Sequence, residues 1–195
     1  MPILYGKNIV LRDMRPEDIT GLRRWVNDLE TVRYLSSRYW MPQSEADTAD
    51  YLDHTMHAGA NGAYFAIANR ENGLYLGQCD LPSINWKMRS AEMAIVMGDE
   101  QARGRGIGTE AIGLMLTYAF AMLGLERVEL EVATDNRRAM RCYQKAGFTL
   151  EGIKRHAFLV DGQYADLAVM AVLAGEWRAA NPGAKLTAEP LSPQE

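Results

Sequence analysis

The sequence predicts a mixed α/β domain, and three observations support this prediction. From Ala63 onward, apolar and polar side chains alternate around an Asn72-Gly73 pair, which is a strong signal for an antiparallel hairpin. The segment that starts at Pro16 instead repeats its apolar residues at helical spacing. Further along, the apolar run 93–97 leads into a glycine-rich loop and then a helical segment, which indicates a strand–turn–helix unit.

Helical segments are predicted where apolar residues recur every three or four positions behind a start signal. Pro16 lies near the first turn of one such segment, and Ser44 with Asp47 forms a capping pair at the start of another. Gly147 ends the last predicted helix. The predicted helices are 16–27, a segment from Ser44 that includes Met56, 110–123 and 136–145.

Strands are predicted where side chains alternate or where a short apolar run lies between turn residues. The predicted strands are 8–12, 64–68, 74–81, 91–97, 128–133, 148–153, 157–160 and 167–173, with a turn at Asp161-Gly162. Residues 181–195 are rich in Pro, Ala and charge, which is typical of a mobile end. We therefore expect one domain over residues 1–177 and a mobile tail over residues 178–195.

Composition narrows the class of protein. A chain of 195 residues with 48% hydrophobic and 24% charged residues is typical of one globular domain. The net charge of −4 argues against a nucleic-acid binder. The longest apolar stretch, residues 111–125, is too short and interrupted to span a membrane, and the N-terminus has no apolar signal core. We expect a cytoplasmic protein without a nucleic-acid or membrane partner.

The loop Arg103-Gly-Arg-Gly-Ile-Gly-Thr109 is the most informative segment. Its alternating glycines let a ligand approach the backbone, and the helix behind it presents unpaired N–H groups and a positive dipole end. This combination predicts a phosphate site, most simply for a pyrophosphate. The alternative is a glycine-rich turn that binds nothing.

The spacing of the glycines argues against two common nucleotide sites. No Lys-Ser or Lys-Thr pair follows them, as a P-loop requires. The order Gly-x-Gly-x-Gly also departs from the Gly-x-Gly-x-x-Gly of dinucleotide-binding domains.

A second segment, residues 135–148, supplies a motif in which Asn136, Ala139 and Tyr143 share one helix face. Together the two segments resemble the GNAT superfamily of acetyl-CoA-dependent N-acetyltransferases. Its pyrophosphate motif, Gln/Arg-x-x-Gly-x-Gly/Ala, is matched from Arg103, and also from Gln101 two residues earlier. We prefer the later register because the helix then starts where the family places it. The second motif, Asn-x-x-Ala/Ser-x-x-x-Tyr-x-x-x-Gly-Phe, is matched throughout.

The resemblance covers residues 8–173 and implies a mixed, mostly antiparallel central sheet that is splayed in the middle and flanked by about four helices. Its N-terminal and C-terminal parts are similar to the branch of ribosomal-protein N-terminal and spermidine N-acetyltransferases. Such relatives often form dimers, so a homodimer is possible. The implied cofactor is acetyl-CoA, without a metal. The implied cofactor-binding residues are Ile95, Val96, Met97, Arg103, Gly104, Arg105, Gly106, Ile107, Gly108, Thr109 and Asn136.

The implied reaction moves an acetyl group directly to a primary amine. Because an amine is protonated near neutral pH, a base must first remove a proton, and we predict Glu92 for this role. Glu131 is the second candidate, and Glu92 as an exposed or acceptor-binding carboxylate is the alternative. Tyr143 is predicted to be the general acid for the leaving thiolate, unless it is a packed core tyrosine.

The acceptor is the open question. In the family it binds between the first helices, their connection and the last strands, where this chain offers Trp25, Tyr34, Tyr39, Trp40, Asp28 and Glu30. These residues suit a small amine or polyamine, a protein N-terminus, or core packing. A catalytically silent acetyl-CoA-binding sensor or scaffold is the alternative function. His54 and His57 lack a third ligand, and Cys79 and Cys142 lack metal spacing, so no metal site is expected.

Overall fold

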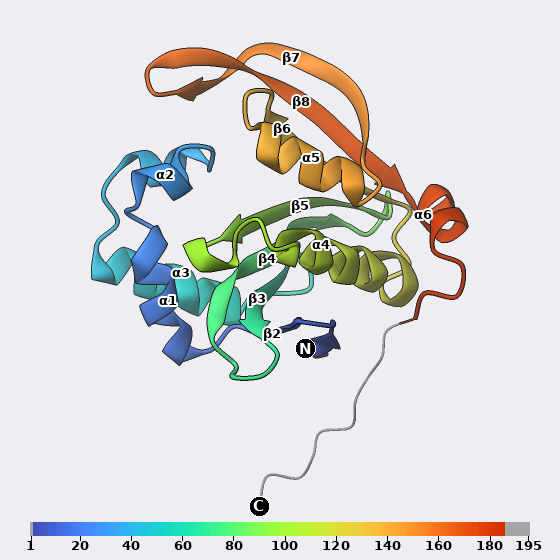
Figure 1. Ribbon diagram of the computed structural model, residues 1–195, viewed down its shortest axis with the longest axis horizontal. Helices are drawn as coiled ribbons and strands as arrows, with labels where there is room; N and C mark the ends of the chain where they lie inside the picture. Colours follow the sequence, from blue (N-terminus) through green and yellow to red (C-terminus); the bar gives the residue numbers. More distant parts are fainter. Residues whose placement is uncertain (1, 186–195) are drawn as a thin grey trace, which may run out of the picture.

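The computed structural model describes residues 2–185 and has an eight-stranded sheet in the order β1-β2-β3-β4-β5-β6-β8-β7, with helices on both faces (Figure 1). The predicted fold class is therefore confirmed. The strands are β1 (Leu4–Tyr5), β2 (Ile9–Asp13), β3 (Ala63–Asn69), β4 (Tyr75–Asn85), β5 (Ser90–Met97), β6 (Arg127–Ala133), β7 (Thr149–Val160) and β8 (Gln163–Leu173). The helices are α1 (Ile19–Trp25), α2 (Leu29–Val32), α3 (Glu45–Met56), α4 (Ile107–Thr117), α5 (Arg137–Lys145) and α6 (Ala174–Ala180).

The splay in the sheet lies between β5 and β6, the parallel pair. Their pairing covers Ser90 to Glu92 on β5 and ends there, whereas β5 stays paired with β4 up to Met97. Beyond Glu92, the edge of β5 that faces β6 therefore has no strand partner. Main-chain groups along this edge are free to bind an extended ligand, as the resemblance implied.

Apolar side chains on the two faces of the sheet form two separate cores. One core joins α1 and α3 to the sheet through Leu22, Trp25 and Leu52. The larger core joins α4, α5 and α6 to the opposite face. Successive residues of β5 alternate between the two cores: Val96 belongs to the first, and Met93, Ile95 and Met97 to the second.

Several predicted boundaries were wrong. The described part of the chain has six α-helices where about four were expected; the one-turn α2 and the seven-residue α6 are the additional ones. Helix α4 begins at Ile107, before the predicted start at residue 110, and a π-helical turn, Tyr118–Met122, continues it. The predicted strands 148–153 and 157–160 form the single strand β7, which contains two irregularities in its register with β8.

The predicted division at residue 177 falls inside a helix. Helix α6 continues to Ala180, and its Trp177 packs in the larger core against Phe120. Residues 186–195 of the predicted mobile tail lie outside the described residues. No helix within residues 2–185 is long and apolar enough to cross a lipid bilayer.

A buried carboxyl group, Asp80, lies in the core under α1 and α3. It is 4% exposed and accepts hydrogen bonds from Gln78 Nε2 at 2.7 Å and from the Phe65 amide at 3.3 Å. No ion pair neutralises it among the described residues. Burial raises its pKa from 3.8 to about 7 despite the hydrogen bond from Gln78, which lowers it.

We expect Asp80 to make the protein less stable as pH rises from about 4 to about 7. In that window the folded state holds a proton that the unfolded state releases, so each step up in pH favours unfolding. The change Asp80→Asn removes this proton uptake. The free energy of unfolding of the variant, relative to wild type, should therefore rise between about pH 4 and pH 7 and stay level above that. Denaturant titrations at several pH values measure it, with the exposed-site variant Asp50→Asn as control. A pH-independent difference for Asp80→Asn would contradict the prediction.

Candidate active site

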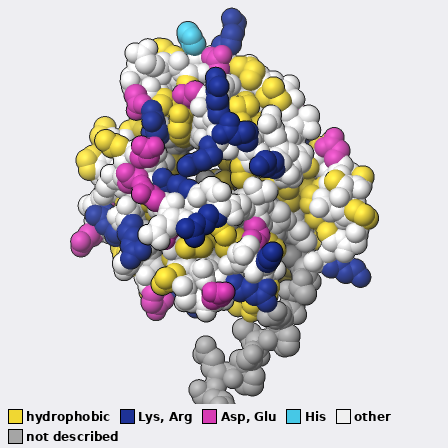
Figure 2. Space-filling view, in the orientation of Figure 1, with side chains coloured by type: hydrophobic (Ala, Val, Ile, Leu, Met, Phe, Trp, Pro, Cys, Tyr) yellow, Lys and Arg dark blue, Asp and Glu magenta, His cyan; other side chains and the backbone are white. Residues whose placement is uncertain are grey.

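A cleft of about 770 Å³ lies between β5, β6, α5, α2 and the glycine loop. Figure 2 shows Lys and Arg side chains around the hollowed centre of this face. The volume is within the usual range for a small-molecule site. The cleft is lined by predicted site residues from both motifs and from β5, namely Glu92, Ile95, Val96, Met97, Arg103, Gly104, Gly106, Gly108, Thr109, Asn136 and Tyr143.

The glycine loop has the shape that a phosphate requires. Gly104 and Gly106 have φ of +75° and +83°, and a Cβ on either would meet no atom within 4 Å, so the space beside them is open. Gly106 caps α4 without any side-chain hydrogen bond, which leaves the first N–H groups of the helix free of a capping partner. These features fit a pyrophosphate held by backbone donors and the helix dipole.

The Arg103 side chain is held by hydrogen bonds to residues outside the glycine loop. It is 12% exposed and donates from Nε to the carbonyl oxygen of Met97 at 3.1 Å. It also donates to the Thr31 hydroxyl on α2. Arg103 thus links the end of β5 to α2. The motif predicts a polar residue at position 103. The contact that its side chain makes depends on where α2 lies, and the sequence did not predict α2.

Three other predicted cofactor residues have roles that the motif does not specify. The Asn136 side-chain oxygen accepts a hydrogen bond from the Ala139 amide at 3.2 Å and so caps α5. Ile107 is 9% exposed and packs in the core beneath α4, so only its backbone can face the loop. Arg105 is exposed and does not line the cleft.

Glu92 and Tyr143 approach the gap from opposite faces of the sheet. Tyr143 packs in the core that contains Ile95, whereas Glu92 alternates with that residue and points to the face of α1 and α3. The two side chains can reach a common point only through the opening between β5 and β6. The arrangement suits a reaction in which two substrates enter from opposite faces and meet in this opening.

Tyr143 is 8% exposed yet lines the cleft. Its ring packs against Phe148 with centroids 5.7 Å apart. Burial raises the pKa of the phenol well above its ordinary value, with smaller contributions from Cys79 and Cys142. The hydroxyl is therefore protonated at neutral pH and can donate a hydrogen bond into the cleft.

The two carboxylates considered as the base differ in their partners. Glu131 lines the cleft but forms an ion pair with Lys154. Glu92 is exposed, lines the cleft, and forms no ion pair or hydrogen bond with its side chain among the described residues. Glu92 is therefore free to contact an incoming amine, whereas Glu131 is already held by Lys154. This difference favours Glu92.

The residues expected near the acceptor lie in different surroundings. Trp25 is 1% exposed, and its ring centroid lies 5.7 Å from that of Tyr39, so this pair belongs to the core. Tyr34 lines the cleft, and Asp28 caps α2 by accepting from the Thr31 amide. Trp40 lies apart from the cleft.

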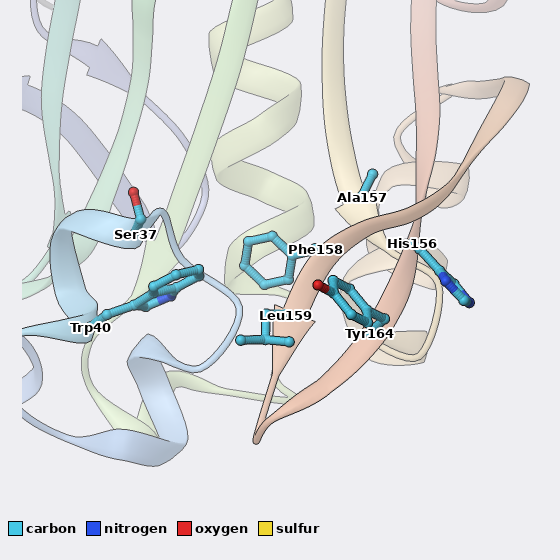
Figure 3. A pocket seen from close by; sticks show the side chains of 7 residues that line it. All are labelled: Ser37, Trp40, His156, Ala157, Phe158, Leu159 and Tyr164. Carbon is cyan, nitrogen blue, oxygen red and sulfur yellow. The ribbon is translucent and has the colours of Figure 1, made fainter.

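A second hollow of about 340 Å³ lies between the short 3₁₀ turn 37–40 and the β7–β8 hairpin (Figure 3). Trp40, 54% exposed, faces Phe158 and Leu159 across it, and Tyr164 stacks on His156. Its walls come from the connection after the first helices and from the last strands, where the resemblance placed part of the acceptor region. Within residues 2–185, no three His, Cys, Asp or Glu side chains gather as metal ligands would.

Comparison with known proteins agrees with this geometry. Residues 8–149 match the sequence profile of the acetyltransferase (GNAT) domain. The chain belongs to the GNAT acetyltransferase family. It is therefore an acetyl-CoA-dependent N-acetyltransferase, and the resemblance indicated by the two motifs is confirmed.

Relatives come from both groups that the motifs suggested. A spermidine N(1)-acetyltransferase of Vibrio cholerae is 30% identical over 175 residues, which cover 88% of this chain and 96% of the relative. A putative ribosomal N-acetyltransferase of Bacillus subtilis is 32% identical over 178 residues, covering 88% and 94%. The crystal structure of spermidine N-acetyltransferase from Vibrio cholerae in complex with CoA and spermine has the same fold, with a TM-score of 0.78, 24% identity, and coverage of 88% and 99%.

Proposed function

We propose that this GNAT enzyme acetylates a small, positively charged amine of the polyamine class. The observation that carries the proposal is a separation of charge between the two faces of the splayed sheet. Glu92 points to the face of α1 and α3, and Glu30 on α2 also lines the cleft. Glu131 points to the same face, but Lys154 already pairs with it. On the opposite face, α5 lines the cleft with Arg and Lys side chains. An anionic donor and a cationic acceptor would each meet a complementary surface.

The donor would lie along the free edge of β5. Its pyrophosphate fits the glycine loop and the uncapped start of α4, and its pantetheine amides fit the unpaired main-chain groups after Glu92. Bound acetyl-CoA supplies a thioester that an amine can attack. Tyr143, which packs with Ile95, would stand near the reacting sulfur.

The Gly106 backbone is a direct test of the donor site. We expect Gly106→Ala to lower the free energy of unfolding by about 1–2 kcal/mol, because φ of +83° disfavours any residue with a Cβ. Affinity for CoA should fall as well, since the loop donors would shift. Thermal unfolding and calorimetric titration measure the two effects. The control Gly113→Ala lies within the same helix at ordinary φ and should stabilise the protein. Unchanged CoA affinity in Gly106→Ala would contradict the site.

In the proposed chemistry, Glu92 and Tyr143 act on the reacting groups from opposite faces of the sheet. Glu92 accepts the proton of the ammonium group, and three residues of strand, about 10 Å, separate it from Ile95, so a water relay is the natural path. The nitrogen loses its second proton as the amide forms, and this proton passes to the departing thiolate. Tyr143 donates to that sulfur. Because a thiol has an ordinary pKa of about 8.5, below that of the buried phenol, complete proton transfer is uphill. A hydrogen bond to the developing thiolate is therefore the main contribution of Tyr143.

Acetyl transfer from acetyl-CoA to a panel of amines tests the proposal. The panel contains spermidine and spermine as polyamines, a primary amine that carries no other charged group, and peptides with free N-termini. We expect the highest kcat/KM with a polyamine. We also expect a loss with Glu92→Gln that is largest near neutral pH, where the acceptor amine is protonated, and that shrinks as pH approaches the pKa of the amine. A preference for peptides would support a protein N-terminal acetyltransferase instead. CoA binding without transfer to any acceptor would point to the sensor alternative.

A further inference from the structure

The cations that line the cleft on α5 have so far been described only as a positively charged face, and no group of the donor has been assigned to them. Arg137, Arg138, Arg141 and Lys145 lie on α5, are exposed, and line the cleft. Arg141 lies three or four residues from each of the other three, so all four share one side of the helix. We refer to these four residues as the basic stripe. None of the four side chains forms an ion pair or hydrogen bond with another described residue.

The basic stripe is unfavourable for the helix itself. Arg137 and Arg138 stand in the first turn of α5, where the helix dipole repels positive charge, and no acidic residue accompanies them there. Arg141 has positively charged neighbours one turn before it and one turn after it, and such like-charge pairs also weaken a helix. A surface that raises the free energy of the ligand-free protein in two ways is expected where a ligand of opposite charge compensates.

Contacts between α4 and α5 place the stripe beside the phosphate loop. The Thr109 hydroxyl, in the first turn of α4, lies 3.2 Å from the Cys142 sulfur in the middle of α5. Arg138 and Arg141 precede this contact point, and Lys145 follows it by about one turn. Long cationic side chains at these positions can therefore reach an anion held next to the loop.

We propose that the basic stripe binds the 3′-phosphate of coenzyme A. This inference rests on the proposed donor site. Backbone N–H groups of the loop and α4 already suit the pyrophosphate, and they leave the terminal monoester phosphate to be neutralised by side chains. That phosphate carries up to two negative charges near neutral pH, and guanidinium groups bind it with paired, charge-assisted hydrogen bonds. The stripe makes the enzyme selective for acetyl-CoA over the form that lacks the 3′-phosphate.

Calorimetric titration of the full chain with CoA and with 3′-dephospho-CoA tests the assignment. Wild type is expected to bind CoA about 10- to 100-fold more tightly than 3′-dephospho-CoA. The double variant Arg138→Ala/Arg141→Ala is expected to lose most of this preference while keeping its affinity for 3′-dephospho-CoA. Arg178→Ala, which changes an exposed arginine of α6 outside the cleft, is the control and keeps the preference.

Ligand-free stability provides a second readout. Because the stripe opposes the dipole of α5, the double variant should unfold at the same temperature as wild type or a higher one. A lower unfolding temperature would mean that the arginines are structural and would overturn the assignment. An equal loss of affinity for both ligands would show that the stripe binds the pyrophosphate instead, and no loss would show that it binds neither; both overturn it. Wild type that binds neither ligand would contradict the proposed function itself.

Discussion

Tyr143→Phe is expected to lower kcat about 100-fold or more while leaving the affinity for CoA within a few-fold of wild type. The phenol is buried, its pKa is raised, and its hydroxyl forms no hydrogen bond with the side chain of another described residue. Loss of one well-placed donor to a developing charge commonly reduces the rate 10²–10³-fold. The ring remains, so packing against Phe148 and the shape of the cleft should be kept.

Steady-state acetylation of the best acceptor, together with calorimetric titration of CoA, measures the two quantities. Tyr118→Phe is the matched control, because Tyr118 is equally buried but packs edge-on against Phe65, outside the cleft. It should retain wild-type kcat. If Tyr143→Phe also retained wild-type kcat, Tyr143 would be a core residue and the assignment to the leaving group would fail.

Asp18→Ala is expected to destabilise the protein by about 3–5 kcal/mol. Asp18 and Arg12 form a two-pronged ion pair with N–O distances of 2.8 and 2.7 Å, and their side chains are 4% and 9% exposed. The same carboxylate accepts the Arg15 amide at 2.9 Å and so orients the start of the first helical segment. Removing one partner leaves a buried, unpaired charge, which is among the costliest single substitutions.

Denaturant unfolding measures the loss, and Asp13→Ala is the matched control. Asp13 pairs with Arg15 at 3.6 Å, but both side chains are 49% exposed, so its loss should cost less than about 1 kcal/mol. The double variant Arg12→Met/Asp18→Leu should recover much of the stability, since an apolar pair leaves no buried charge. Equal effects of Asp18→Ala and Asp13→Ala would contradict the burial argument.

How much the sequence predicted depended on the range of the interactions involved. The hairpin at Asn72-Gly73 and the turn at Asp161-Gly162 were predicted because turn geometry is a local property of those residues. Helix α2 was missed because one turn has too few residues for periodicity, although Asp28 and Thr31 supply a visible cap. The bend within β7 was read as a gap between strands, because a bulge with His156 at φ +50° interrupts the alternation.

The basic stripe shows a signal that sequence reasoning did not use. Arg137, Arg138, Arg141 and Lys145 stand at helical spacing with no acid in the first turn, and this pattern is visible in the printed sequence. It acquires meaning only when the contact between Thr109 and Cys142 brings α5 against the phosphate loop. A row of cations on an isolated helix would otherwise be a solvated surface.

The sequence alone predicted the family and its acetyl-CoA donor, because both follow from two motifs that can be read along the chain. It also predicted the glycine turn and the helix behind it, because turn conformation and helix start signals depend on neighbouring residues. Only the tertiary structure decided which groups face one another. It turned Arg103 toward Thr31, paired Glu131 with Lys154, left Glu92 free, and set Tyr143 on the opposite face of the splayed sheet. Those relations join residues tens of positions apart, and their geometry follows from strand order and packing rather than from any local pattern.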